Sequence, residues 1–215
     1  MLEELARRHA WADDEKRTPP MTITAVSGAD DERVTRVFGG DIATARRMTF
    51  EEAGHWNKFG RLPYSRAGRH CVQVVSADER KVVVIENHGA HGALPEIARR
   101  ASANGAEFMS VHWLNDADYQ VMHAVDGVVD AVFDPLEFAY YPEEDPEPPQ
   151  PPAYVPDWAA AAGFHIERVG ATSIALLETM LDVRVDPVWL LIPLRTVGVP
   201  PTDRLFTDLA AATTW

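Results

Sequence analysis

Five short runs of β-prone residues lie between His70 and Asp134, and they constrain the fold more than any other feature. Runs of this length that are rich in Val, Ile and aromatic residues are typical of strands. The first two are separated by Ala-Asp-Glu-Arg, and the last two by Asp126-Gly127, a strong signal for a two-residue hairpin. The runs therefore predict hairpins built into a sheet. They cover residues 70–76, 81–86, 107–114, 119–125 and 128–134.

A helical segment at residues 94–102 interrupts the series. Pro95 stands near its start and Asn104-Gly105 follows its end, as expected at the two ends of a helix. A helix between two strands suits a right-handed crossover connection. We therefore expect an α+β fold with a mixed, mostly antiparallel five-stranded sheet. One βαβ crossover helix would cover the sheet, with further helices before and after it.

Helical patterns flank the strands on both sides. Residues 3–12 predict a short amphipathic helix, and residues 30–38 predict a helix with an acidic first turn. Thr49 followed by Glu52 forms a capping-box pattern at the start of another helix. After residue 157, two helical segments precede a short helix that begins at Pro187 and is broken by Pro193.

Proline marks the main division of the chain. Residues 135–156 hold eight of the sixteen prolines and five acidic residues, without Lys or Arg. This composition predicts an extended acidic strap whose aromatic ends lie on the domain. We expect four parts. They are an N-terminal helix or arm (1–20), an α+β core (21–134), the strap (135–156) and a C-terminal helical segment packed on the core (157–215).

Composition narrows the classes of partner and of site. The net charge is −13, which argues against nucleic acid and suits a basic protein partner. Cys71 is the only cysteine, so an internal disulfide and a zinc site with several cysteines are excluded, and a buried apolar role is expected. The chain shows neither an apolar signal-peptide core nor an apolar run of about 18 residues. We expect a cytoplasmic protein without membrane contact.

The loop "ENHGAHG" at residues 86–92 invites two site interpretations. Glu86, His88 and His91 carry groups that bind metals, and Gly89 and Gly92 could cradle an anion with backbone N–H groups. The spacing fits neither a standard zinc motif, a dinucleotide fingerprint nor a P-loop. The simpler interpretation is a strand-to-helix turn, where Gly, His and Asn tolerate positive φ. We therefore expect no bound metal and no cofactor.

A second constellation depends on strand register. If both hairpins turn as their sequences suggest, Ser110 lies opposite His123, and His123 lies opposite Asp130. This Ser-His-Asp row is an alternative catalytic site, although the chain lacks a G-x-S-x-G nucleophile elbow. The preferred interpretation is a polar sheet face, shared by His112 and Tyr119, that serves as a binding surface.

The order of these segments resembles an uncharacterised family from actinobacteria that is known only as a domain of unknown function. The resemblance covers roughly residues 30–200 and rests on "VVVIENHG", "DGVVDAVFDP" and "LLETMLDV". The family implies the α+β fold and supplies no catalytic residues.

Two functions follow as hypotheses. The first is a protein-binding role, antitoxin-like, immunity-like or regulatory, through an acidic surface and the polar sheet face. Its binding residues would be His112, Tyr119, His123, Asp130, Glu143, Glu144, Asp145 and Glu147. The alternative is a small hydrolase or metal-dependent enzyme that uses the sheet face or the 86–92 loop. We favour binding, because no cofactor fingerprint and no established catalytic motif is present.

Overall fold

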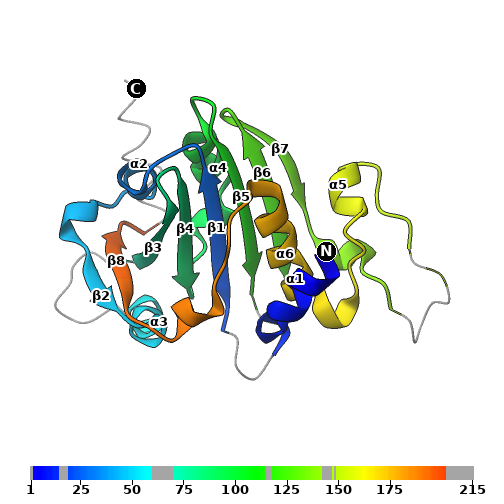
Figure 1. The fold of residues 1–215 in the computed structure, drawn as a ribbon, viewed down its shortest axis with the longest axis horizontal. Coiled ribbons are helices and arrows are strands. Elements are labelled where there is room, and N and C mark those ends of the chain that lie inside the picture. The colour runs from blue at the N-terminus through cyan, green and yellow to red at the C-terminus, as the bar shows by residue number, and fades with distance from the viewer. Residues whose placement is uncertain are drawn as a thin grey trace.

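The computed structural model describes residues 2–14, 19–59, 70–114, 118–141, 147 and 149–201. Within them, eight strands form one open sheet in the order β2-β8-β3-β4-β1-β5-β6-β7, and every neighbouring pair is antiparallel (Figure 1). The strands are β1 (Met21–Ser27), β2 (Arg46–Met48), β3 (His70–Asp78), β4 (Lys81–Asn87), β5 (Glu107–Trp113), β6 (Tyr119–Val125), β7 (Val128–Phe133) and β8 (Leu194–Val199).

Helices cover both faces of the sheet. Helices α1 and α6 lie in front of it in Figure 1, and α4 lies behind. The α-helices are α1 (Leu2–Arg8), α2 (Asp31–Val37), α3 (Phe50–Phe59), α4 (Pro95–Ser102), α5 (Asp157–Ala160) and α6 (Val169–Leu181). Short 3-10 turns occupy Ala10–Asp13, Ile42–Thr44, His91–Ala93, Pro135–Phe138, Ile166–Arg168 and Pro187–Leu190. No described helix combines the length and the apolar character needed to cross a membrane.

The alternation of side chains along each strand builds two hydrophobic cores. Met109 and Val111 of β5 pack with the apolar residues of α6, so we name this side the α6 face. Phe108 and Met122 pack with Ile97 of α4 on the opposite side, the α4 face. Because both faces are covered, the expected polar, solvent-facing sheet surface does not exist. Ser110, His112 and His123 are all buried.

The expected βαβ crossover between neighbouring parallel strands is wrong, because β1 lies between the two strands. Strands β4 and β5, which flank α4, run in the same direction, as a crossover requires. They are not neighbours, however, because β1 lies between them and pairs antiparallel with each. Its sequence, MTITAVS, places Met21, Ile23 and Ala25 on the α6 face and Val26 on the α4 face. The sheet is therefore antiparallel throughout the described residues.

The C-terminal segment was expected to be helical, and it also contributes a strand. The turn that begins at Pro187 is a single 3-10 turn. After Pro193 the chain becomes β8, which pairs with β3 on one side and with the three-residue β2 on the other. Strands β2 and β8 were not expected from the sequence, and neither was β1. The sheet therefore has eight strands and not the expected five.

The local signals at hairpins and helix starts are confirmed. The 70–87 hairpin turns at Glu79-Arg80 and the 119–133 hairpin at Asp126-Gly127. The capping box at α3 is formed by reciprocal bonds, since the Glu52 N–H donates to Thr49 Oγ1 (3.2 Å) and the Thr49 N–H donates to Glu52 Oε2 (2.7 Å). Local sequence therefore determines these turns and this cap.

The ends of the proline-rich strap lie on the domain, as expected. Tyr140 exchanges two backbone hydrogen bonds with the segment before α6, through Phe164 O (2.8 Å) and the Ile166 N–H (3.1 Å). The Tyr154 hydroxyl donates to Glu137. Residues 149–156 form neither helix nor strand, and Glu147 is exposed. The predicted binding residues Glu143, Glu144 and Asp145 lie outside the described residues.

Candidate functional site

Four polar side chains form a straight row across the α4 face of the sheet. In the observed register, Thr22 of β1 lies opposite Glu86 of β4 and opposite His112 of β5, and His112 lies opposite Gln120 of β6. The loop that follows β4 folds back over this row. The Gln120 amide donates to Ala93 O (3.1 Å), and the Thr22 hydroxyl donates to Gly89 O (2.7 Å). The loop at residues 86–92 therefore covers this polar row.

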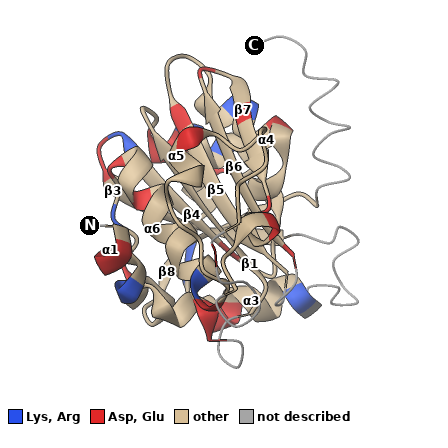
Figure 2. Ribbon diagram, turned by 90° about the vertical axis from the view of Figure 1, so that its right-hand side faces the viewer, with Lys and Arg blue, Asp and Glu red and all other residues tan. Residues whose placement is uncertain are grey.

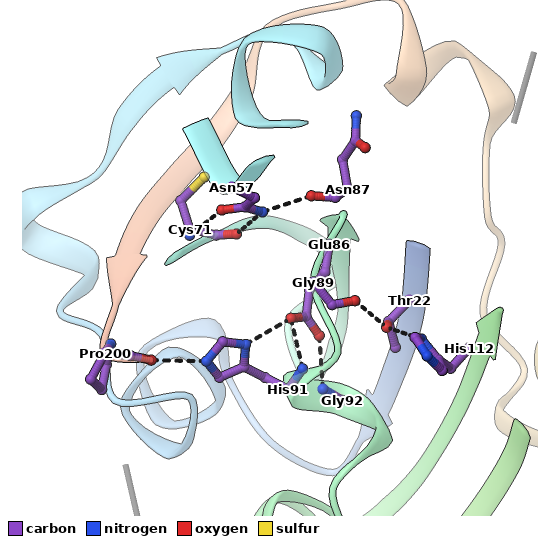
Figure 3. Close-up of polar contacts among 10 residues, drawn as sticks. All are labelled: Thr22, Asn57, Cys71, Glu86, Asn87, Gly89, His91, Gly92, His112 and Pro200. Atoms are coloured by element: carbon purple, nitrogen blue, oxygen red, sulfur yellow. Dashed lines mark hydrogen bonds and ion pairs between the residues drawn. The ribbon is translucent and has the colours of Figure 1, made fainter. Parts of the chain in front are cut away.

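Glu86 is the centre of this arrangement (Figure 3). Its side chain is buried, with 1% of the residue exposed. One carboxylate oxygen, Oε2, accepts from the His91 backbone N–H (2.9 Å) and contacts His91 Nδ1 (3.0 Å). The other, Oε1, accepts from the Gly92 N–H (2.7 Å). A buried carboxylate needs such partners, and Glu86 obtains all of them from its own loop.

His91 connects this loop to the end of the sheet. Its Nδ1 faces the Glu86 carboxylate, and its Nε2 lies 2.9 Å from the carbonyl oxygen of Pro200, just beyond β8. Both neighbours are acceptors, so both ring nitrogens must carry hydrogen, which describes the imidazolium form. Burial disfavours that charge, but the hydrogen bond and the negative charge of Glu86 outweigh it and raise the pKa of His91 above its usual value.

The surroundings of His112 shift its pKa in the opposite direction. The single hydroxyl hydrogen of Thr22 is used on Gly89 O, so the 2.9 Å contact between Thr22 Oγ1 and His112 Nδ1 requires Nδ1 to donate. Burial lowers the pKa of His112, although the charges of Glu86 and Asp118 oppose this. A neutral ring that donates from Nδ1 satisfies both observations. His112 is thus a structural member of the row and not part of an exposed binding surface.

The glycines of the loop are required for a different reason from the one expected. His88 has a positive φ of 56°, as a strand-to-helix turn predicts. Gly89 and Gly92 are instead needed for close approach. A Cβ on Gly92 would lie 2.0 Å from Thr24 Oγ1, and one on Gly89 would lie 2.7 Å from Glu86 Oε2. The loop can fold over the row only where side chains are absent.

The three residues of the metal alternative are not gathered into a ligand set. Glu86 and His91 bond each other, whereas His88 is half-buried, and its backbone N–H donates to Pro20 O (2.8 Å). Across the described residues, no group of three His, Cys, Asp or Glu side chains is arranged to hold a metal ion. Glu86 and His91, two of the three candidate ligands, thus bond within the fold.

Cys71 lies close to this site, and its thiol is unreactive because burial keeps it protonated. It is buried on β3, and its thiol contacts Ala53 O (3.7 Å). Burial raises the pKa of the thiol to about 12, and the negative charge of Glu86 adds to the effect. Asn57 of α3 bonds the Cys71 backbone N–H (2.8 Å) and Asn87 O (2.7 Å), which fixes α3 on the ends of β3 and β4.

The alternative catalytic row is not assembled. Ser110 pairs with Met122, and His123 pairs with Met109, one residue away from the expected register. Because side chains alternate, Ser110 is on the α4 face and His123 on the α6 face. Ser110 is 1% exposed, and its buried hydroxyl has no hydrogen-bond partner among the described residues. No general base therefore lies beside it, and the register expectation for Ser110 was wrong.

The His123–Asp130 contact does form, through a β-bulge. The expected pairing of β6 with β7 holds from Val125 to Ala124 and then shifts, so that His123 pairs with Ala131. The bulge turns Asp130 toward His123, and Nδ1 lies 2.7 Å from Asp130 Oδ1. Nε2 lies 2.9 Å from Glu107 Oε1. His123 is 4% exposed and joins two acidic residues at the rim of the sheet.

A further buried ion-pair cluster, absent from the sequence-based expectations, joins α1 to α6. The buried Glu178 accepts from the Val185 N–H (2.5 Å) and contacts His9 Nε2 (3.1 Å) and the Arg8 guanidinium. Burial opposes ionisation of Glu178, but these hydrogen bonds and charges lower its pKa below the usual value. Glu86 with His91 and Glu178 with His9 are thus buried ion pairs that stabilise the fold.

Comparison with known protein families finds no matching family, and searches of curated proteins and of solved structures find no match either. The resemblance to an actinobacterial family thus remains an expectation, and any function must be argued from the geometry and charge of this chain.

The charge of the chain is sharply segregated. Residues 101–167 contain thirteen acidic residues and no Lys or Arg, so the rest of the chain holds twenty acidic and twenty basic residues. All of the net charge of −13 therefore resides in one continuous segment. Among the described residues, that segment contains β5, β6, β7 and α5, which lie on one side of the sheet (Figure 1).

We name this side the acidic edge. Figure 2 views the molecule from it and shows acidic positions on α5 and along the β6–β7 hairpin. Burial raises the pKa of Asp134, and the negative charges of Glu137 and Asp118 add to the increase. The acidic edge comprises Asp118, Asp126, Asp130, Asp134, Glu137 and Asp157.

The opposite side of the sheet carries basic residues. The edge strand β2 exposes Arg46 and Arg47, and Arg195 of the adjacent β8 pairs with Asp31. Behind the acidic edge, Arg99 and Arg100 of α4 both contact Glu96. Residues 101–167 themselves contain no Lys or Arg that could neutralise the acidic edge.

Proposed function

We propose that the protein binds a basic protein partner, without catalysis, through the acidic edge. The observation that carries this proposal is that residues 101–167 account for the whole net charge, and that their strands β5, β6 and β7 are consecutive at one end of the sheet. Complementary charge steers association and fixes the orientation of a complex. The residues outside 101–167 have no net charge, so the acidic edge is the surface that would attract a cationic partner.

The interior of the fold supports binding over catalysis. Glu86 and His91 are each 1% exposed and bond each other, the loop backbone and Pro200, so a substrate cannot reach them in this conformation. His112 is held by Thr22, and the Cys71 thiol is kept protonated by burial. The side chains that most often perform acid–base or nucleophilic chemistry therefore stabilise the fold here.

The binding surface differs from the one expected from the sequence. His112 and His123 are buried, and Tyr119 is half-buried, where it stacks on Trp113 with ring centroids 6.3 Å apart. Of the sheet residues expected to bind, Asp130 is the one on the acidic edge. An antitoxin-like, immunity-like or regulatory interaction in the cytoplasm is the role that we propose for this surface.

Two matched triple variants test the proposal. Each removes three exposed carboxylates and leaves the same net charge. The edge variant carries Asp118→Asn, Glu137→Gln and Asp157→Asn. The control variant carries Glu4→Gln, Glu51→Gln and Glu79→Gln. The probe is a capped ten-residue peptide of alternating Lys and Val, titrated at low ionic strength.

The edge variant should bind this peptide about tenfold more weakly than the control variant. Three exposed charge pairs at roughly 0.5 kcal/mol each give about 1.5 kcal/mol, and about 1.4 kcal/mol corresponds to a factor of ten. The wild type and the control should have similar affinity, and added salt should weaken both. Equal affinities for the two triple variants, or no binding by the wild type, would rule out the acidic edge as the binding surface.

A further inference from the structure

The outer side of β7 is an unpaired sheet edge. Strand β7 is the last in the sheet order and pairs only with β6. Among the described residues, Val128–Phe133 make no backbone hydrogen bond on the other side. Alternate N–H and C=O groups of an edge strand point outward and can pair with another extended chain. The opposite edge strand, β2, is only three residues long.

The exposed side chains of β7 combine apolar groups with one charge. Val128 is 63% exposed and Val132 is 44% exposed, and the Asp130 side chain between them is 47% exposed. Val125 of β6 is exposed beside them. Exposed valines next to unpaired backbone groups favour association with another chain, and a partner strand would bury both.

The negative charge of Asp130 on β7 favours a basic segment over a second copy of this chain as the added strand. A second copy that paired antiparallel about Asp130 would place two carboxylates opposite each other, which destabilises a strand pair. The bulge places Val132 on the α4 face with Met122, whereas Val128 and Asp130 lie on the α6 face. A segment that alternates basic and apolar residues would place Lys or Arg opposite Asp130 on one face and an apolar residue beside Val132 on the other. The rest of the acidic edge would attract the same segment.

We propose that an extended basic segment of the partner adds to the sheet as a ninth strand along the free side of β7. This inference rests on the proposed function and adds the mode of recognition. Backbone hydrogen bonds to β7 supply affinity, and Asp130 and Val132, on opposite faces of the strand, select a basic side chain on one face and an apolar side chain on the other. The β-bulge at Asp130 twists the strand and sets the position at which the basic side chain must lie.

Amide hydrogen exchange of β7 tests this binding mode. The Lys–Val peptide is compared with a Lys–Pro peptide of equal charge, in which every second residue lacks a backbone N–H and the prolines favour a polyproline conformation over a strand. The outward amides of β7 should exchange at least about tenfold more slowly with the Lys–Val peptide, because a hydrogen-bonded amide exchanges only when it opens. The Val132→Lys variant should lose this protection. Its control, Val188→Lys, alters a valine that is 43% exposed elsewhere and should retain it.

Each outcome has one meaning. If both peptides bind equally and the β7 amides stay unprotected, the added strand is wrong, while charge recognition by the acidic edge stands. If neither peptide binds, the proposed function fails and the added strand fails with it. If protection survives Val132→Lys, the peptide does not lie along β7.

Discussion

Replacing Glu86 with alanine should lower the free energy of unfolding by about 3–5 kcal/mol, the usual cost of breaking a buried ion pair by removing one partner. The variant removes the acceptor for the Gly92 N–H and for both the backbone and the ring of His91. It also leaves the His91 cation buried without its counter-charge. Urea unfolding of the wild type and the variant measures the difference.

The control for this experiment is Glu79→Ala, in the exposed turn between β3 and β4. Its stability should remain within about 0.5 kcal/mol of the wild type, as is usual for surface substitutions. A Glu86→Ala variant as stable as the control would show that the loop does not depend on this carboxylate. The account of the polar row as a structural device would then be incorrect.

Replacing His91 with asparagine should have an effect that depends on pH. The asparagine amide can still donate toward Glu86, so the variant mainly removes the positive charge. The folded-state pKa of His91 is raised above its value in the unfolded chain, where a histidine titrates near about 6.5. The stabilisation is therefore fully present below that unfolded value and is lost as the pH rises through the folded-state pKa.

The advantage of the wild type over His91→Asn should thus be largest in mildly acidic buffer, up to about 3–5 kcal/mol, and should shrink on moving to alkaline buffer. Unfolding curves collected across that pH range provide the measurement. His55→Asn, on the exposed surface of α3, provides the same substitution outside this site. A difference between wild type and His91→Asn that stays constant with pH would contradict the charged state of His91.

Local signals in the sequence predicted the elements that depend on local contacts. Asp126-Gly127 turned a hairpin where expected, and Thr49 and Glu52 formed their capping box, because each interaction lies within four residues. The helix at Pro95–Ser102 was found for the same reason. These features require no knowledge of the rest of the chain.

The strands that depend on distant partners were missed. Strand β1 follows a proline pair, and nothing near Met21–Ser27 shows that it will enter between β4 and β5. Strand β8 completes the sheet from more than 100 residues beyond β3. The expected crossover helix was consequently assigned to neighbouring strands, whereas a third strand separates them.

Register was the least predictable property of the site. A shift of one residue between β5 and β6 moved Ser110 to the face opposite His123, while a bulge in β7 restored the contact of His123 with Asp130. The charge segregation, by contrast, is fully readable from the sequence, since no Lys or Arg occurs between Arg100 and Arg168. The expectation of an acidic strap captured only part of this segment.

The most direct test of the central claim is zero-length carbodiimide cross-linking in lysate of the source cell, followed by mass-spectrometric mapping. This reagent joins carboxylates of the protein to lysine amines of a bound partner. Our account predicts that the intermolecular cross-links fall on the thirteen acidic residues of 101–167 and on few of the twenty others. Cross-links spread over all 33 acidic residues in proportion to their number would contradict it.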